Sequence, residues 1–136
     1  MADLQIFELL EAAQKIEKKL NLGLIYSRLR LPQFRILMIL EKSGKMTVTD
    51  LSRCLNVTRA TMSVLVNQLI ESQLVETVEH KKDKRSFYLQ LNNKGNERLD
   101  LAKRELDMVM ERLDLNLDQD TTDKLNQFAW SILNRS

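Results

Sequence analysis

The sequence contains few of the residues that break or cross-link a chain. Its 136 residues include one cysteine, one proline, three glycines and one histidine, and aromatic residues make up 5%. A lone cysteine excludes a disulfide framework, which makes the cytoplasm the default compartment. Scarce proline and glycine argue against a sandwich or barrel of short strands and favour helices. A single histidine argues against a metal site, because such sites need several ligands.

Features expected of other protein classes are missing as well. No apolar run reaches the roughly 18 residues that a membrane span needs, and no signal peptide opens the chain. There is no glycine-rich phosphate loop, no nucleophile elbow and no plausible pairing of cysteine with histidine. The acidic residues are scattered along helix faces, as on a solvated surface. We therefore expect no membrane association, no cofactor and no enzymatic activity.

The length suits one compact domain, and its charge is unevenly distributed. Residues 31–95 hold ten basic and six acidic residues, whereas residues 96–136 hold six and nine. A positive excess confined to one segment is expected where that segment faces a polyanion, although such a shift also arises by chance.

Hydrophobic spacing predicts a mainly α fold with a small β-hairpin. Helices are expected over residues 3–27, 32–43, 47–55, 58–72, 93–113 and 118–133, and strands over 74–79 and 86–91. Within the first of these helices, Gly23 is a point where the helix could bend or end. Between residues 47 and 92 the order is helix, turn, helix, strand, basic loop, strand. That order is typical of a winged helix-turn-helix, with the recognition helix at about 58–72 and the wing at about 74–91. For the second helix, the predicted apolar face is Phe34, Leu37, Met38 and Leu40.

The predicted recognition helix has two contrasting faces. One face, suited to a core, carries Met62, Leu65, Val66, Leu69 and Ile70 at helical spacing. The other face is polar but nearly uncharged, and its small and amide side chains suit an approach to base edges, with a merely solvated helix as the alternative. This outer face comprises Ala60, Ser63, Val64, Asn67, Gln68 and Glu71, flanked by Arg59 and Thr61. Thr58 is the expected N-cap of this helix, and Thr47 or Thr49 that of the preceding one.

The last two predicted helices carry apolar stripes that indicate packing against another helix or a second chain. In the helix over 93–113 one stripe has the spacing of a helix–helix seam, and a second stripe lies beside it. The seam consists of Leu99, Ala102, Leu106, Val109 and Leu113, and the second stripe of Leu101, Met108 and Leu115. The final helix has Leu125, Phe128, Ala129 and Ile132 as its expected inner face, and core packing is the default for Trp130.

These features resemble the MarR (multiple-antibiotic-resistance regulator) family. The matching phrases are LRLPQFRIL (29–37), VTDLSRCLNVTRATMSVLVNQLIESQLV (48–75), DKRSFYLQLNNKG (83–95) and LDQDTTDKLNQFAWSIL (117–133). The most specific piece is Asp83-Lys84-Arg85. The resemblance implies a homodimer with an N-terminal dimerisation helix (1–30), a winged helix-turn-helix that binds DNA (31–92) and C-terminal dimerisation helices (93–136).

The resemblance also implies roles for individual residues. Arg59, Thr61 and Ser63 match positions that touch bases and phosphates in the major groove, Arg85 matches a wing residue that reaches the minor groove, and Asp83 matches the acid that holds it. Together with the residues chosen from the pattern, the candidate DNA-binding set is Thr47, Thr49, Thr58, Arg59, Ala60, Thr61, Ser63, Val64, Asn67, Gln68, Lys81, Lys82, Asp83, Lys84 and Arg85.

The sequence departs from the family pattern in two places. Val64 and Gln68 stand where relatives often carry basic residues, so we expect affinity to come from the wing. Arg28-Leu29-Arg30 replaces the usual Gly-Leu-Thr, so the second helix loses its threonine cap.

For the other candidate residues, a functional role stands beside an ordinary structural one. By family analogy, a small aromatic or carboxylate effector would bind among Tyr26, Arg28, Arg30 and Phe34, with plain surface arginines as the alternative. Cys54 reads as a small, partly buried hydrophobic residue rather than a redox sensor, and His80 as a further phosphate contact.

The expected function is that of a sequence-specific transcription regulator, usually a repressor, that binds a palindromic operator as a homodimer. The alternative is a winged-helix module for protein–protein contact, although such modules usually lack a basic wing.

Overall fold

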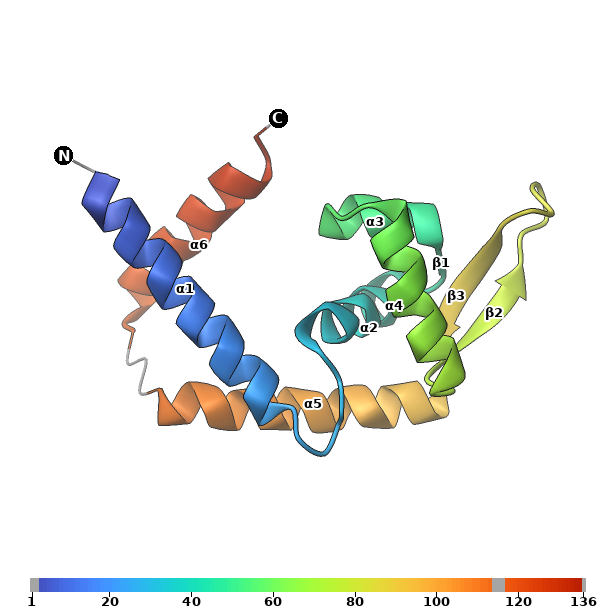
Figure 1. The fold of residues 1–136 in the computed structure, drawn as a ribbon, viewed down its shortest axis with the longest axis horizontal. Coiled ribbons are helices and arrows are strands. Elements are labelled where there is room, and N and C mark those ends of the chain that lie inside the picture. Colours follow the sequence, from blue (N-terminus) through green and yellow to red (C-terminus); the bar gives the residue numbers. More distant parts are fainter. Residues whose placement is uncertain (1–2, 114–116, 136) are drawn as a thin grey trace.

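The computed structural model describes residues 3–113 and 117–135. The order is α1 (Asp3–Gly23), α2 (Leu31–Ser43), β1 (Met46–Thr47), α3 (Val48–Leu55), α4 (Arg59–Glu71), β2 (Val75–Glu79), β3 (Phe87–Leu91), α5 (Asn93–Arg112) and α6 (Gln119–Leu133). In Figure 1 the elements from α2 to β3 gather above one end of α5, and α1 and α6 rise from the other end. The predicted mainly α fold with a winged helix-turn-helix is confirmed.

Local side-chain caps explain where three of the helices begin. Thr47 Oγ1 accepts the N–H of Asp50 at 3.0 Å, and Asp50 Oδ2 accepts the N–H of Thr47 at 3.3 Å, which forms a capping box for α3. Thr58 Oγ1 caps α4 by accepting the N–H of Thr61 at 3.1 Å. Asn92 caps α5 in the same way. Of the two threonines proposed for α3, Thr47 is therefore the cap, and Thr49 lies inside the first turn.

The start of α2 is held without the threonine that the sequence lacks. Gln33 Oε1 accepts the N–H of Arg30 at 3.0 Å, and Asn21 Oδ1 accepts the N–H of Leu31 at 3.0 Å. These two amide side chains satisfy the N–H groups of the first two residues at the start of α2, whereas a side-chain cap would accept an N–H two or three residues further on. Because Asn21 belongs to α1, the same bond ties α2 to α1.

The first helix ends at Gly23, the residue proposed as a point where it could bend or end, and so does not continue to residue 27. A Cβ at Gly23 would overlap the side chain of Val109 on α5, so α1 and α5 cross closely at this glycine. Beyond it, Leu24 and Leu29 turn into the core, and Arg28 adopts a left-handed backbone with a φ of 57°. The helix predicted from hydrophobic spacing extends past Gly23 because Leu24 falls on the same periodic pattern.

The predicted hairpin is part of a three-stranded antiparallel sheet with the order β1-β3-β2. Leu89 of β3 lies opposite Met46 on one side and Thr77 on the other. The sequence did not reveal β1, since a strand of two residues is too short to show an alternating pattern. This extra strand joins the wing to the start of α3.

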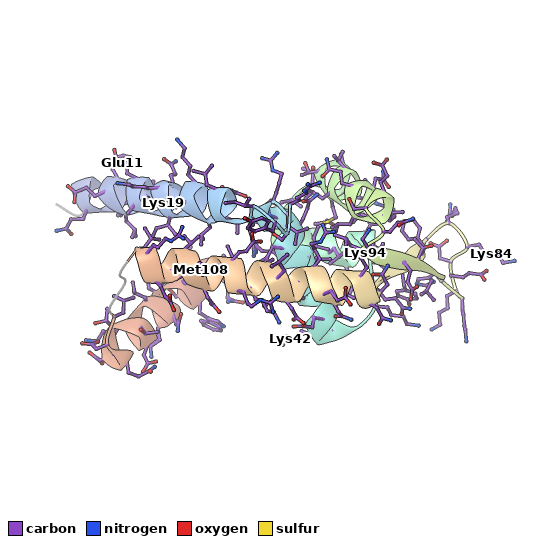
Figure 2. The ribbon with its side chains drawn as sticks, turned by 90° about the horizontal axis from the view of Figure 1, so that it is seen from below. Glu11, Lys19, Lys42, Lys84, Lys94 and Met108 are labelled. Carbon is purple, nitrogen blue, oxygen red and sulfur yellow. The ribbon has the colours of Figure 1, made fainter. Side chains whose placement is uncertain are left out.

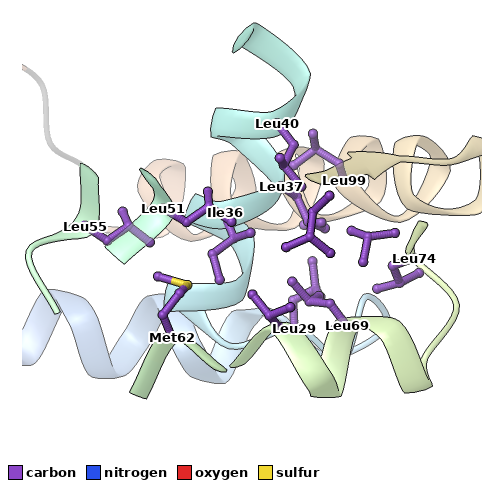
Figure 3. Close-up of a cluster of buried hydrophobic side chains, with 14 of the residues drawn as sticks. Leu29, Ile36, Leu37, Leu40, Leu51, Leu55, Met62, Leu69, Leu74 and Leu99 are labelled. Atoms are coloured by element: carbon purple, nitrogen blue, oxygen red, sulfur yellow. The ribbon is translucent and has the colours of Figure 1, made fainter. Parts of the chain in front are cut away.

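The hydrophobic core lies where α2, α3, α4, the sheet and α5 meet (Figure 3). The predicted inner stripe of α4 is confirmed, with Met62, Val66 and Leu69 fully buried. The predicted face of α2 was partly wrong, because Ile36 is fully buried whereas Met38 is 38% exposed. The core labelled in Figure 3 consists of Leu29, Ile36, Leu37, Leu40, Leu51, Leu55, Met62, Leu69, Leu74 and Leu99.

The helix α5 buries its predicted seam within its own chain. Leu99, Ala102 and Val109 are buried, while Met108 of the second stripe is exposed. Leu115, assigned to that second stripe, lies outside the described residues.

The last helix, by contrast, buries none of its residues. Its predicted inner face, with Leu125, Phe128 and Ile132, is about half exposed, and Trp130 is 68% exposed. The prediction that Trp130 packs in a core is therefore wrong for the single chain. Figure 2 shows α1 and α6 on different sides of the same end of α5, far from the wing tip at Lys84. Among the described residues, no helix has both the length and the hydropathy to cross a membrane.

Candidate nucleic-acid interface

The outward face of α4 is exposed along its length. Arg59, Ala60, Thr61, Val64 and Asn67 are exposed, and Ser63 is half-buried. Two hydroxyls are already engaged, because Thr58 Oγ1 and Thr61 Oγ1 lie 2.9 Å apart in a hydrogen bond at the first turn. The structure thus places most of the predicted recognition residues on one open, nearly uncharged surface.

Gln68 differs from the rest of this face because it is bonded to another helix. Gln33 Nε2, on α2, donates to Gln68 Oε1 at 2.8 Å. Gln33 is 8% exposed, so this amide pair is largely shielded from solvent on the α2 side. Gln68 therefore orients α4 against α2 in addition to facing outward.

The recognition helix and the wing meet at the start of α3. Arg59 from α4 and Arg85 from the wing both line a small cavity of about 30 Å³ beside Thr47, Val48 and Thr49. Two arginines thus line this corner at the N-terminus of α3, where the helix end carries a partial positive charge. Four residues predicted from separate stretches of sequence are brought together here.

The wing tip is shaped by Asp83. Its Oδ1 accepts the backbone N–H of Arg85 at 3.0 Å, and its Oδ2 accepts the hydroxyl of Ser86 at 3.3 Å. The Arg85 N–H and the side chains of Ser86 and Arg85 hold the pKa of the Asp83 carboxyl below its ordinary value against the opposing effect of desolvation. The Arg85 side chain itself is 94% exposed, and its Nε lies 3.6 Å from Oδ1. Asp83 thus fixes the backbone and pairs loosely with the Arg85 guanidinium, which is presented to solvent.

The three lysines of the loop are exposed, and Figure 2 shows Lys84 at the far end of the wing. His80 does not join them. Its ring stacks on Tyr88, and its Nδ1 accepts the N–H groups of Lys82 and Asp83. These contacts give His80 a role within the loop, and the phosphate contact expected of it stays a prediction. A histidine three residues before the loop aspartate was the signal that sequence reasoning missed.

The four candidate effector residues do not line one cavity. Tyr26 and Arg28 line a cavity of about 470 Å³, together with Lys94 and Arg98 of α5. Arg30 lines a different cavity of about 450 Å³, beside α1. Phe34 is partly buried and packs against the core. Sequence reasoning missed the two α5 cations because they lie far along the chain from Arg28.

A buried carboxylate holds the turn between α1 and α2. Glu105 on α5 is 8% exposed, and its oxygens accept the N–H groups of Tyr26 at 2.8 Å and Ser27 at 3.0 Å. Burial raises the pKa of Glu105, but the hydrogen bonds from this turn outweigh it and lower the pKa below its ordinary value. Arg98, which lies two turns before Glu105 on α5, donates to the carbonyl of Ser27 at 2.9 Å.

Cys54 is exposed on α3, contrary to the expectation of partial burial. Leu51, Ser52 and Leu55 occupy the inner face of this short helix, which leaves position 54 outside. Within the described part of the chain, no three histidine, cysteine or acidic side chains are grouped as a metal site would require.

Two comparisons by sequence bear on this surface. A sequence model described as the MarR family matches residues 29–86, from the end of the α1–α2 turn into the wing. The HTH-type transcriptional repressor YetL of Bacillus subtilis (strain 168) is 34% identical over 70 residues. That match covers 50% of this chain and 42% of the repressor, so it spans less than half of the length of that relative.

Solved structures match the fold over nearly the whole chain. The transcriptional repressor CouR, bound to a 23-mer DNA duplex, has a TM-score of 0.87 at 22% identity, with 98% of this chain and 94% of that chain covered. A mutant of Escherichia coli MarR, complexed with operator DNA, has a TM-score of 0.83 at 20% identity, with 97% and 96% covered. At these identities the likeness shows the fold. Over residues 29–86 the chain is thus similar to the MarR family, and its fold over nearly the whole chain is that of the two DNA-bound proteins.

Proposed function

We propose that this protein is a sequence-specific regulator of transcription, a repressor, that binds double-stranded DNA as a homodimer on a palindromic operator. The observation that carries the proposal is the open, nearly uncharged face of α4 beside a basic wing whose arginine is presented to solvent. Small and amide side chains can approach base edges closely, and the apolar Ala60 and Val64 suit thymine methyl groups. The two solved family members with bound DNA support this reading.

The wing supplies the charge that α4 lacks. Lys81, Lys82, Lys84 and Arg85 form a solvated basic tip, and Arg59 and Arg85 converge at the start of α3. Contacts of this kind with phosphates release counterions, so affinity falls steeply with salt. Specificity then comes from α4 and affinity largely from the wing.

Replacing Arg85 with alanine tests whether the wing supplies much of the affinity for DNA. A duplex selected from a random pool would be titrated by fluorescence anisotropy at several salt concentrations. We expect Arg85→Ala to weaken binding about tenfold and to reduce the slope of log affinity against log salt by about one. Unfolding by heat should be unchanged, because the side chain is 94% exposed.

Lys124→Ala is the matched control, since this exposed cation lies on α6, away from the wing. Equal binding by wild type and Arg85→Ala would remove the wing from the interface. If the wild type binds no duplex even at low salt, the DNA-binding proposal fails. The alternative function, a winged-helix module for protein–protein contact, would then be favoured.

The homodimer rests on the apolar surface that the single chain leaves uncovered. Ile6, Phe7 and Leu10 on α1 and Phe128 and Ile132 on α6 are about half exposed or more. A helix of 15 residues is marginal in water without packing, and α6 buries nothing within its own chain. A second copy would cover both helices and would place two copies of α4 for two half-sites about one helical turn apart.

The cavity between Tyr26, Arg28, Lys94 and Arg98 suits a small aromatic or carboxylate effector. It also touches Leu69 and Ser72 at the end of α4, so a bound ligand would press on the recognition helix. An aromatic carboxylate such as benzoate should lower the affinity of wild type for its selected duplex, and Arg28→Ala should abolish this response. A response unchanged in Arg28→Ala would place the effector elsewhere.

A further inference from the structure

We propose that His80 is a positioning residue for the wing: its ring holds the basic loop in the shape that presents Arg85 to DNA. The inference rests on the proposed DNA-binding function and adds a residue that itself need not touch DNA. It concerns the loop that runs from Lys81 to Arg85 between β2 and β3.

The loop closes on His80 through a short series of hydrogen bonds. His80 Nδ1 accepts the N–H of Lys82 at 3.3 Å and that of Asp83 at 3.0 Å. Asp83 in turn accepts the N–H of Arg85 at 3.0 Å, and its carbonyl accepts the N–H of Ser86 at 3.0 Å. The backbone around Asp83 is therefore fixed from both sides, and the direction in which Arg85 leaves the loop follows from it.

The ring of His80 is itself held by its neighbours. Val78 lies opposite Tyr88 in the sheet, so His80 is the diagonal neighbour of Tyr88 on the same face. The two rings stack with their centroids 4.6 Å apart and an angle of 15° between their planes. Lys45 Nζ, just before β1, lies 4.7 Å from the centroid of Tyr88. The imidazole is thus anchored to the sheet, whereas the loop it holds extends into solvent.

The charge of the loop makes such an anchor necessary. Four cations within five residues repel one another, and Asp83 is the one acid among them. Exposed charges alone favour an extended and variable loop. Two backbone N–H groups directed at one nitrogen instead select a single turn, and this requires a ring whose Nδ1 carries no proton.

Three substitutions of His80 separate this role from a general effect of the side chain. The amide oxygen of asparagine can take the place of Nδ1, the longer glutamine places its oxygen nearer the position of Nε2, and alanine offers no acceptor. For the selected duplex we expect His80→Ala and His80→Gln to bind about tenfold more weakly than wild type, the equivalent of two lost hydrogen bonds. His80→Asn should stay within about twofold.

A double-mutant cycle with Arg85→Ala then tests whether His80 acts through the wing arginine. In the Arg85→Ala background, His80→Ala should cost no more than about a further twofold, because the group that it positions is already absent. Fully additive losses, or an asparagine variant as weak as the alanine variant, would overturn the proposal.

Amide hydrogen exchange provides a readout that needs no DNA. The N–H groups of Lys82 and Asp83 should be protected in wild type and in His80→Asn, and should exchange faster in His80→Ala. Equal exchange in wild type and His80→Ala would also overturn the proposal. If wild type binds no duplex, the proposed function fails and the role in DNA binding fails with it, while exchange still reports whether His80 orders the loop.

Discussion

Replacing Phe128 with glutamate should convert the proposed homodimer into monomers and weaken binding to a two-half-site duplex by about 100-fold or more. Phe128 is 52% exposed in the single chain, on the same face of α6 as Leu125 and Ile132. Burying this face against a second copy would remove apolar surface from water, whereas a carboxylate there would have to be desolvated without a partner. Monomers would also lose the second half-site, which a dimer binds at high effective concentration.

The measurement is sedimentation velocity, followed by anisotropy on the same samples. Gln127→Glu is the matched control, since it adds the same charge at the next position, where the side chain points away from the apolar face. The control should remain dimeric and bind normally. A Phe128→Glu variant that remains dimeric would show that α6 is not the covered surface, and a monomeric wild type would refute the homodimer itself.

Glu105→Gln should destabilise the fold by about 1.5–3 kcal/mol, the range for hydrogen bonds to a charged group. The carboxylate offers an oxygen to each of two backbone N–H groups, at Tyr26 and Ser27. Glutamine keeps one oxygen but turns its NH₂ group toward the other N–H. Urea unfolding at pH 7 measures the difference, and Glu111→Gln, an exposed acid near the end of the same helix, is the control.

The cost of this substitution should depend on pH. The pKa of Glu105 is lower in the folded protein than its ordinary value of 4.5, so the ionised carboxylate stabilises the fold above that value. The stabilisation is lost as the pH falls through the lower, folded pKa. The gap in unfolding free energy between wild type and Glu105→Gln should therefore narrow below about pH 4.5. A gap that is constant from pH 7 to pH 3 would mean that packing, not charge, holds the turn.

The parts of the fold that local chemistry determines were predictable from the sequence. Thr58 caps α4 because a hydroxyl at that place satisfies an N–H three residues on, and the core stripe of α4 follows from helical spacing alone. The Asp83–Arg85 pair was also visible, because both residues lie in one loop.

What could not be predicted depends on residues far apart in the chain. Glu105 holds a turn that lies 78 residues before it, and no local pattern marks that pairing. Ile36 rather than Met38 faces the core because α5 and the sheet fix the rotation of α2. The apolar face of α6 looks like a core face in the sequence, but nothing in its own chain buries it.

The amide pair between Gln33 and Gln68 constrains how the recognition surface can evolve. A lysine at position 68 would take away the oxygen that accepts from Gln33 Nε2. The Nε2 group of the buried Gln33 would then be a donor without a partner. The amide could not simply flip, because its Oε1 accepts the N–H of Arg30. A gain of charge on α4 thus requires a compensating change on α2, so positions 33 and 68 are expected to diverge together rather than one at a time.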